Sequence, residues 1–111
     1  MIPLPEIVRE LTPDEQPVEK LVEVAGLYLR TYHLPMVGMV VPQHVHDYDH
    51  ATLICAGKIR GWCDGEWIGD KGPGEAFLIK AGCQHTFESL EPSMLTCIHN
   101  IQDALDSHKG I

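Results

Sequence analysis

Short apolar runs, interrupted by glycine and polar turn residues, follow one another along most of the chain after Pro17. This pattern is typical of an all-β domain, in which each run forms a strand and each interruption a turn. It predicts eight strands, near residues 19–24, 27–33, 38–41, 51–55, 58–63, 75–79, 83–87 and 94–99. The long helical segments that alternate with strands in a parallel α/β fold are missing from the pattern, which excludes that class.

The junctions between these runs carry residues that favour tight turns. Asp64-Gly65 is the strongest hairpin signal, because both residues tolerate the positive φ angles of a two-residue turn. Eight short strands in one small domain must protect their edges. They can do so by closing into a barrel or by packing as the two sheets of a jelly roll.

The two ends of the chain differ from this β-rich middle. Residues 1–17 hold four prolines and little apolar periodicity, which predicts a proline-rich N-terminal arm that lies on the surface or reaches a neighbour. A short helix over residues 6–11 is the one element the pattern allows there. Residues 103–111 are polar and are expected to fray as a C-terminal tail. The β domain is therefore placed at residues 18–102.

Composition narrows the range of partners. With 111 residues the chain fits one domain, and 8 basic against 16 acidic side chains give a net charge of −8. This balance excludes nucleic acids and anionic membranes as partners, because both are recognised by clustered Lys and Arg. The sequence has no membrane-length apolar run and no secretory signal, so we expect a cytoplasmic location. The four cysteines, which show no CxxC spacing, are then expected to be small buried thiols: Cys55, Cys63, Cys83 and Cys97.

Histidine is the residue type that suggests chemistry, since three of the seven histidines lie within residues 44–50. On an extended strand His44 and His46 point to the same side, with Cα atoms roughly 6.5 Å apart, so both imidazoles can reach one ion. A turn after them lets His50 begin the next strand facing the same point. His85 is the natural fourth ligand from a distant part of the chain. A solvent-exposed loop rich in His and Asp would give the same local pattern without binding anything.

The spacing of these residues resembles the two sequence motifs of the cupin family. The first motif is matched by Gly38, five residues, His44 and His46, three residues, His50, six residues and Gly57. The second is matched by Gly74, five residues, Lys80, Ala81 and Gly82, two residues, His85, three residues and Ser89. Together they cover residues 38–89, and 16 residues separate them.

The resemblance implies a double-stranded β-helix, that is, a jelly-roll barrel, with one metal held inside. Carried over residue by residue, its ligands are His44, His46 and His85. The chain departs from the family at three positions: Lys80 replaces a proline, Ser89 an asparagine, and His50 stands where the family has a glutamate ligand. An all-histidine set leaves the charge of a divalent ion uncancelled, and this favours an anionic ligand.

The identity of the metal and the reaction stay open at this point. Imidazole suits Zn, Cu, Fe and Ni, and the sequence leaves one divalent transition metal (Fe, Zn, Ni or Mn) as the cofactor. Tetrahedral Zn with four histidines would be structural, whereas a six-coordinate ion keeps two positions for a small-molecule ligand or O2. One hypothesis is therefore an enzyme of dioxygenase or Lewis-acid type acting on a small anionic organic substrate. The alternative is a non-catalytic sensor or structural module. No catalytic residue is assigned.

Other polar residues admit two interpretations each. Asp47 and Asp49 solvate a turn or orient an imidazole, and His99 is a structural histidine or a pocket base. Arg30 shares one strand face with Tyr28 and Tyr32. We expect that face to point outward, since Leu27 and Leu29 on the other face favour the core; if it lines the barrel, Arg30 could bind a substrate carboxylate.

An outward-facing Trp62, together with the proline-rich arm, predicts a homodimer. His33 and His108 match no motif position and are expected at the surface.

Overall fold

The computed structural model describes residues 2–5 and 18–106, with the backbone alone for residues 18–19, 42–44 and 104–106. The expected helix at 6–11 and His108 lie outside this range. The described residues form nine strands and one short helix: β1 (Val18–Val24), β2 (Leu27–Leu34), β3 (Val40–His44), β4 (His50–Ala56), β5 (Ile59–Cys63), β6 (Glu66–Lys71), β7 (Ala76–Ile79), β8 (His85–Ser89), β9 (Ser93–Asn100) and α1 (Ile101–Asp106).

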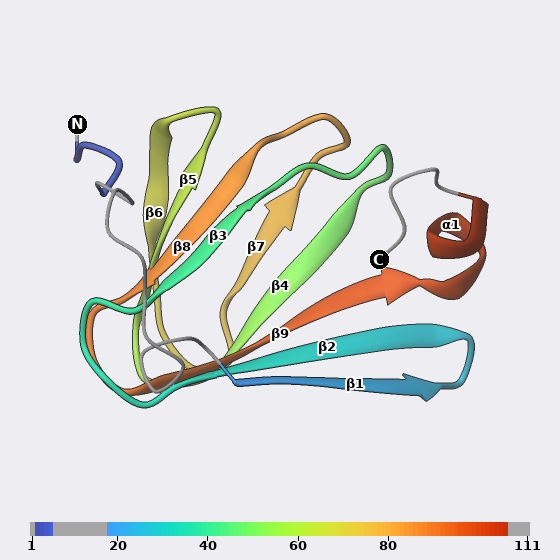
Figure 1. Ribbon diagram of the computed structural model, residues 1–111, viewed down its shortest axis with the longest axis horizontal. Helices are drawn as coiled ribbons and strands as arrows, with labels where there is room; N and C mark the ends of the chain where they lie inside the picture. Colours follow the sequence, from blue (N-terminus) through green and yellow to red (C-terminus); the bar gives the residue numbers. More distant parts are fainter. Residues whose placement is uncertain (1, 6–17, 107–111) are drawn as a thin grey trace.

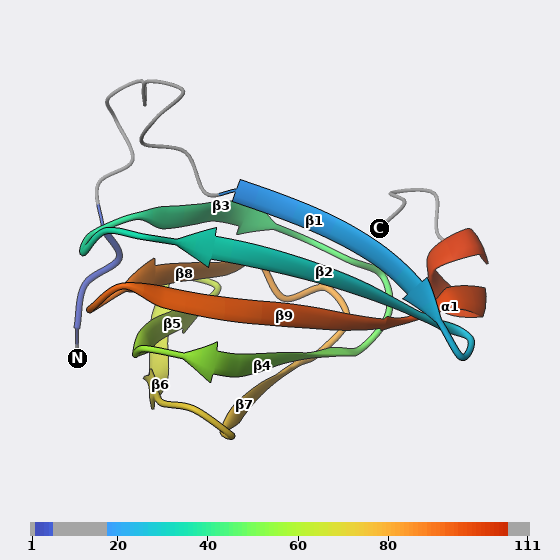
Figure 2. The ribbon, with the colours of Figure 1, turned by 90° about the horizontal axis from the view of Figure 1, so that it is seen from below.

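The strands form two antiparallel sheets, which confirms the all-β class and the jelly-roll architecture. One sheet has the order β1-β2-β9-β4-β7 and the other the order β3-β8-β5-β6 (Figures 1 and 2). The apolar core lies between them, because its members come from both sheets: Tyr32, Leu34, Ile54, Phe77, Ile79, Leu95 and Cys97 from the first, and Val41, Ile59 and Phe87 from the second. All eight predicted strands are present, shifted by up to three residues at their ends.

Strand β6 and helix α1 were not predicted. In β6 the apolar pattern is weak, since Glu66, Gly69, Asp70 and Lys71 make up most of it, and the strand lies at the edge of its sheet. Its pairing with β5 shifts register between Gly61 and Trp62, which breaks the alternation that a sequence pattern relies on. Helix α1 includes residues 103–106, which the sequence predicts to fray. Its first turn is capped by the Asn100 side chain, which accepts from the Gln102 and Asp103 amides at 2.9 and 3.1 Å. Among the described residues, no helix is of the length and apolarity needed to cross a bilayer.

The face of β2 that carries Arg30 lies inside the molecule, so the expectation that it points outward is wrong. Tyr32 and Leu34 on this face are 5 % and 0 % exposed and belong to the core. By alternation Arg30 shares their face, and it stands opposite Cys97, which is also buried. The two large apolar residues at the end of β2 therefore decide its orientation, and Leu27 and Leu29 lie on the outer face.

Trp62 is also not the exposed interface residue that we expected. It does face away from Ile59 and Cys63, but it is only 1 % exposed. Its indole Nε1–H donates to the carbonyl oxygen of Ile2 at 2.9 Å, so the start of the chain itself covers this face of β5. The homodimer stays a prediction, and Trp62 no longer contributes to it.

The tight turns behave as their residue types require. Asp64 and Gly65 have φ angles of 52° and 80° and join β5 to β6 as predicted. Gly57, between β4 and β5, combines a φ of 78° with close packing, since a Cβ there would meet Ser93 Cα at 2.7 Å, as well as Ser93 Oγ and the Pro92 carbonyl. Gly65 has a similar φ, but a Cβ there would meet nothing within 4 Å.

These two glycines give a matched pair of substitutions. Gly65→Ala should lower the free energy of unfolding by about 1 kcal/mol, the cost of a left-handed backbone for a residue with a Cβ. Gly57→Ala should lower it by about 3 kcal/mol, because the backbone of Pro92 and Ser93 must also shift. Urea denaturation followed by tryptophan fluorescence measures both, and equal losses would contradict the close approach at Gly57.

Candidate metal centre

Three histidines meet inside the molecule at one end of the two sheets. His46 lies in the loop after β3, and His50 and His85 are the first residues of β4 and β8. They are 6 %, 7 % and 2 % exposed. One ring nitrogen from each lies within 4.8 Å of one from the other two. Three residues predicted as ligands are thus brought together from three segments of the chain.

Backbone pairing fixes where each of these histidines lies. The His46 carbonyl accepts from the Gly82 N–H at 2.8 Å, which joins the β3–β4 loop to the loop before β8. His50 pairs with Ile79 of β7, and His85 pairs with Cys63 of β5. Backbone pairing therefore holds the three histidines at the ends of both sheets.

His44 is placed by its backbone alone, because its side chain lies outside the described part of the structure. Strand β3 shifts register between Val41 and His44, and Pro42 falls within this irregularity on an edge strand, where its missing N–H is tolerated. After the shift His44 pairs directly with His85. Its role as a fourth ligand stays a prediction.

His99 joins the cluster as well, although it belongs to neither motif. It is 1 % exposed, and its ring stacks on that of His50 with centroids 4.8 Å apart and planes at 18°. Its ring centroid is 5.1 Å from that of His46. The alternation of Leu95, Cys97 and His99 along β9 was the signal in the sequence, because it places all three side chains on the buried face.

Tyr48 is a further residue that the sequence did not single out. Its hydroxyl forms a 3.1 Å hydrogen bond with His99 Nδ1, and the side chain is buried. Burial raises the pKa of Tyr48, while the positive charge of Arg30 opposes that shift. Tyr48 and Arg30 thus lie on the same interior side as the histidines.

Asp49, one of the two aspartates between the histidines, links two loops of the site. Asp49 is exposed, and its Oδ1 accepts from the Ala81 N–H at 2.8 Å while its Oδ2 lies 3.6 Å from Lys80 Nζ. The Ala81 amide, helped by the Lys80 charge, holds the pKa of Asp49 below its usual range. Asp49 therefore ties the two loops of the site together and does not orient an imidazole. Asp47 is exposed, and His33 is exposed as expected.

A disulfide lies next to His85, because Cys63, one of its two cysteines, pairs with His85 across β5 and β8. This bond corrects the expectation of four buried thiols. Cys63 is bonded to Cys83, 20 residues away, while Cys55 is free and exposed and Cys97 free and buried. Asp64 supports the same junction, because its Oδ1 accepts from the Gln84 N–H at 2.9 Å. Cys63, Asp64 and Cys83 form a second compact group of ligand types, but its two sulfurs are bonded to each other.

The donor set of the histidine cluster fits a transition metal. Imidazole nitrogens are ligands for Zn, Cu, Fe and Ni, and three of them within 4.8 Å can bind one ion. Mg and Ca prefer oxygen ligands, and the cluster of three offers none. The geometry therefore supports a metal-binding site and leaves the choice among these metals open.

Comparison with known proteins gives a fold but no sequence relative. No family model matches the sequence, and no curated protein matches it. A chain described as an RmlC-like cupin protein from Desulfovibrio desulfuricans superposes with a TM-score of 0.68 at 15 % identity, covering 90 % of this chain and 97 % of that one. A cupin superfamily protein from Desulfitobacterium hafniense gives 0.66 at 18 % identity, covering 90 % and 96 %. The DMSP lyase DddQ from Ruegeria pomeroyi gives 0.68 at 20 %, covering 87 % and 54 %.

These similarities confirm the cupin fold implied by the two motifs.

The Cys63–Cys83 disulfide leads to a test of stability. Reducing it should lower the free energy of unfolding by about 3 kcal/mol, as expected for closing a loop of this length. Urea denaturation of oxidised and reduced protein measures the change, with Cys55→Ala as the control that leaves the oxidised protein unaffected. Thiol titration of unreduced, unfolded protein should find the two free cysteines, Cys55 and Cys97. Four titratable thiols and an unchanged stability would contradict the bond.

Proposed function

We propose that this cupin-fold protein binds one divalent transition metal through His46, His50 and His85, with His44 as the fourth ligand. We further propose that it acts as an enzyme on a small anionic organic substrate. The observation that carries the first proposal is the buried triad of imidazoles within 4.8 Å of one another. A bound ion would supply Lewis-acid polarisation or a site for O2.

The charge of the site supports an anionic ligand. With histidine at position 50, the three clustered side chains contribute no negative charge that would offset the charge of an ion. Arg30 adds a permanent positive charge on the same interior side, close enough to Tyr48 to lower its pKa, while the carboxylates of Asp47 and Asp103 lie close enough to raise it. Arg30 can bind a carboxylate through two parallel hydrogen bonds, and Tyr48 adds a hydroxyl group to the same region.

A catalytic role is favoured over a structural one by the polar groups around the triad. A metal that only joined strands would need no more than its ligands. Here Tyr48 and His99 are also buried and joined by a hydrogen bond, and Arg30 lies on the interior face of β2, so polar groups that could contact a substrate surround the triad. The cytoplasmic location remains a prediction beside this proposal.

Metal content is the first test. Protein purified without added metal should retain one transition-metal ion per chain, measured by elemental analysis. Loss of a hydrogen bond to a metal ligand already weakens metal affinity roughly tenfold. Removing a ligand itself should weaken metal affinity further, so His85→Ala and His46→Ala should lose the metal on dialysis. His33→Ala, at an exposed position, is the matched control. Equal retention by all four proteins would place the ion elsewhere.

Anion binding is the second test, and it separates an enzyme from a passive module. Adding oxalate to cobalt-substituted protein should change the visible spectrum, because an accessible ion takes the anion as a ligand. Arg30→Met should weaken that binding by about tenfold, the loss of one charge-assisted interaction, without changing the cobalt content. Lys20→Met, on the exposed strand β1, should leave it unchanged. A spectrum unaffected by any small anion would favour the structural module.

A further inference from the structure

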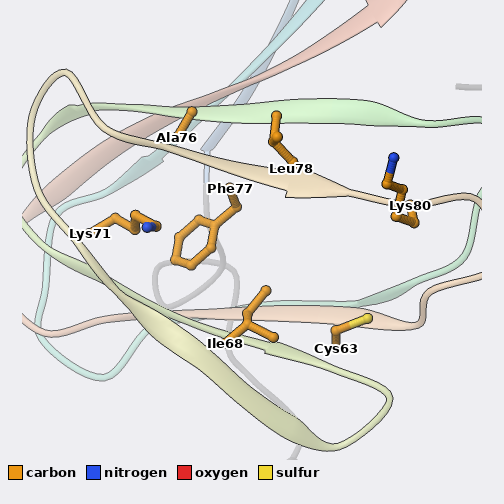
Figure 3. Close-up of a pocket in the computed structure, with 7 residues that line it drawn as sticks. All are labelled: Cys63, Ile68, Lys71, Ala76, Phe77, Leu78 and Lys80. Carbon is orange, nitrogen blue, oxygen red and sulfur yellow. The ribbon is translucent and has the colours of Figure 1, made fainter.

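A cleft lies between the edge strands of the two sheets, and no histidine lines it. β6 ends the four-stranded sheet and β7 ends the five-stranded one, so the sheet order leaves these two strands unjoined. The cavity between them has a volume of about 350 Å³. Figure 3 shows the Phe77 ring and Ile68 pointing toward each other across this cavity, Lys71 at one end, and Leu78 pointing away on the other side of β7. A volume of this size is sufficient for a small organic molecule.

The floor of this cleft is rigid. Phe77 is 2 % exposed and packs on Phe87, with ring centroids 5.2 Å apart. Its ring also lies against the backbone of Gly61, where an added Cβ would come within 2.8 Å of it. The aromatic surface therefore keeps its place whether or not the cleft is filled, which lowers the free-energy cost of binding.

The walls of the cleft expose apolar surface to water. Ile68 is 39 % exposed and faces the cleft from β6, whereas Leu78, which is 77 % exposed, lies on the opposite face of β7 from Phe77 and borders the cleft only at its rim. Removing apolar surface from water favours binding. An apolar chain lying along the cleft would cover Ile68.

Lys71 supplies a positive charge within this apolar cleft. Its Nζ lies 5.7 Å from the centroid of the Phe77 ring. Within the described part of the chain Lys71 has no carboxylate partner, whereas Lys80, the second lysine that lines the cleft, pairs with Asp49. The chain has a net charge of −8, but the Lys71 ammonium group gives this cleft a local positive charge, which attracts an anionic head group.

We propose that the cleft between β6 and β7 is a binding site for a carboxylate with an apolar chain. The apolar chain lies between Ile68 and the Phe77 ring, and the carboxylate pairs with Lys71 at the end of the cleft. No histidine lines the cleft, although two of its lining residues, Cys63 and Lys80, also contact segments of the metal centre, and the carboxylate is proposed to bind at Lys71 without the ion. The proposal therefore holds or fails separately from the proposed enzyme function.

Octanoate is a suitable probe. Titration of isotope-labelled protein followed by NMR should show saturable shifts in the amides of β6 and β7, both with and without metal. The neutral analogue octanamide should bind about tenfold more weakly, since it lacks the charge that Lys71 recognises. Lys71→Met keeps the apolar stem of the side chain and should weaken octanoate binding by the same factor while leaving octanamide unaffected.

Two further variants complete the test. Lys20→Met removes a lysine from the exposed strand β1 and should bind octanoate as the wild type does. Ile68→Asp adds a negative charge inside the cleft at a partly exposed position of an edge strand, so it should fold normally and abolish octanoate binding. The proposal is overturned if octanoate shifts only amides near His46, His50 and His85. It is equally overturned if Lys71→Met and wild type bind octanoate alike, or if no saturable binding occurs.

Discussion

The burial of several imidazole rings side by side between two β-sheets is the constraint on which the rest of this molecule depends. Polar groups taken out of water cost free energy unless they find partners inside the protein. A single cation can accept a lone pair from each of His46, His50 and His85 at once, which no single hydrogen-bond donor can do. The residues that hold this arrangement are therefore as informative as the histidines themselves.

Those supporting residues come from all around the site. Gly82 binds the backbone of His46, the Asp49 side chain binds Ala81, and the disulfide fixes the strand next to His85. Each contact joins two segments distant along the chain, so the cluster is an outcome of tertiary structure. Tyr48 and Arg30 bring hydroxyl and guanidinium groups to the same interior side. A metal site with such neighbours is equipped to distinguish one small anion from another.

The sequence predicted the fold, and it predicted that three of the histidines come together, because the two motifs fix their spacing; at position 50 the residue type departs from the motif. His46, His50 and His85 could be identified in this way before any coordinates were known. His99 was harder to assign, since only strand alternation points to it. For Arg30 the alternation misled, because both faces of β2 carry apolar residues and the burial of Tyr32 and Leu34 decides between them.

Other features could not be predicted from local pattern at all. The hydrogen bond from Trp62 to the Ile2 carbonyl joins residues far apart in the sequence, and so does the disulfide between Cys63 and Cys83. The mostly polar edge strand β6 has the composition of a loop. Strand β6, paired with β5, forms one wall of the β6–β7 cleft, so the cleft could not be predicted from the sequence either.

X-ray absorption spectroscopy of the zinc-loaded protein tests the central claim most directly. The account predicts a first shell of nitrogen at about 2.0–2.1 Å from the metal, with the outer-shell scattering that imidazole rings produce. A first shell of sulfur at about 2.3 Å would instead place the ion at reduced Cys63 and Cys83. That result would contradict a histidine metal centre in this protein.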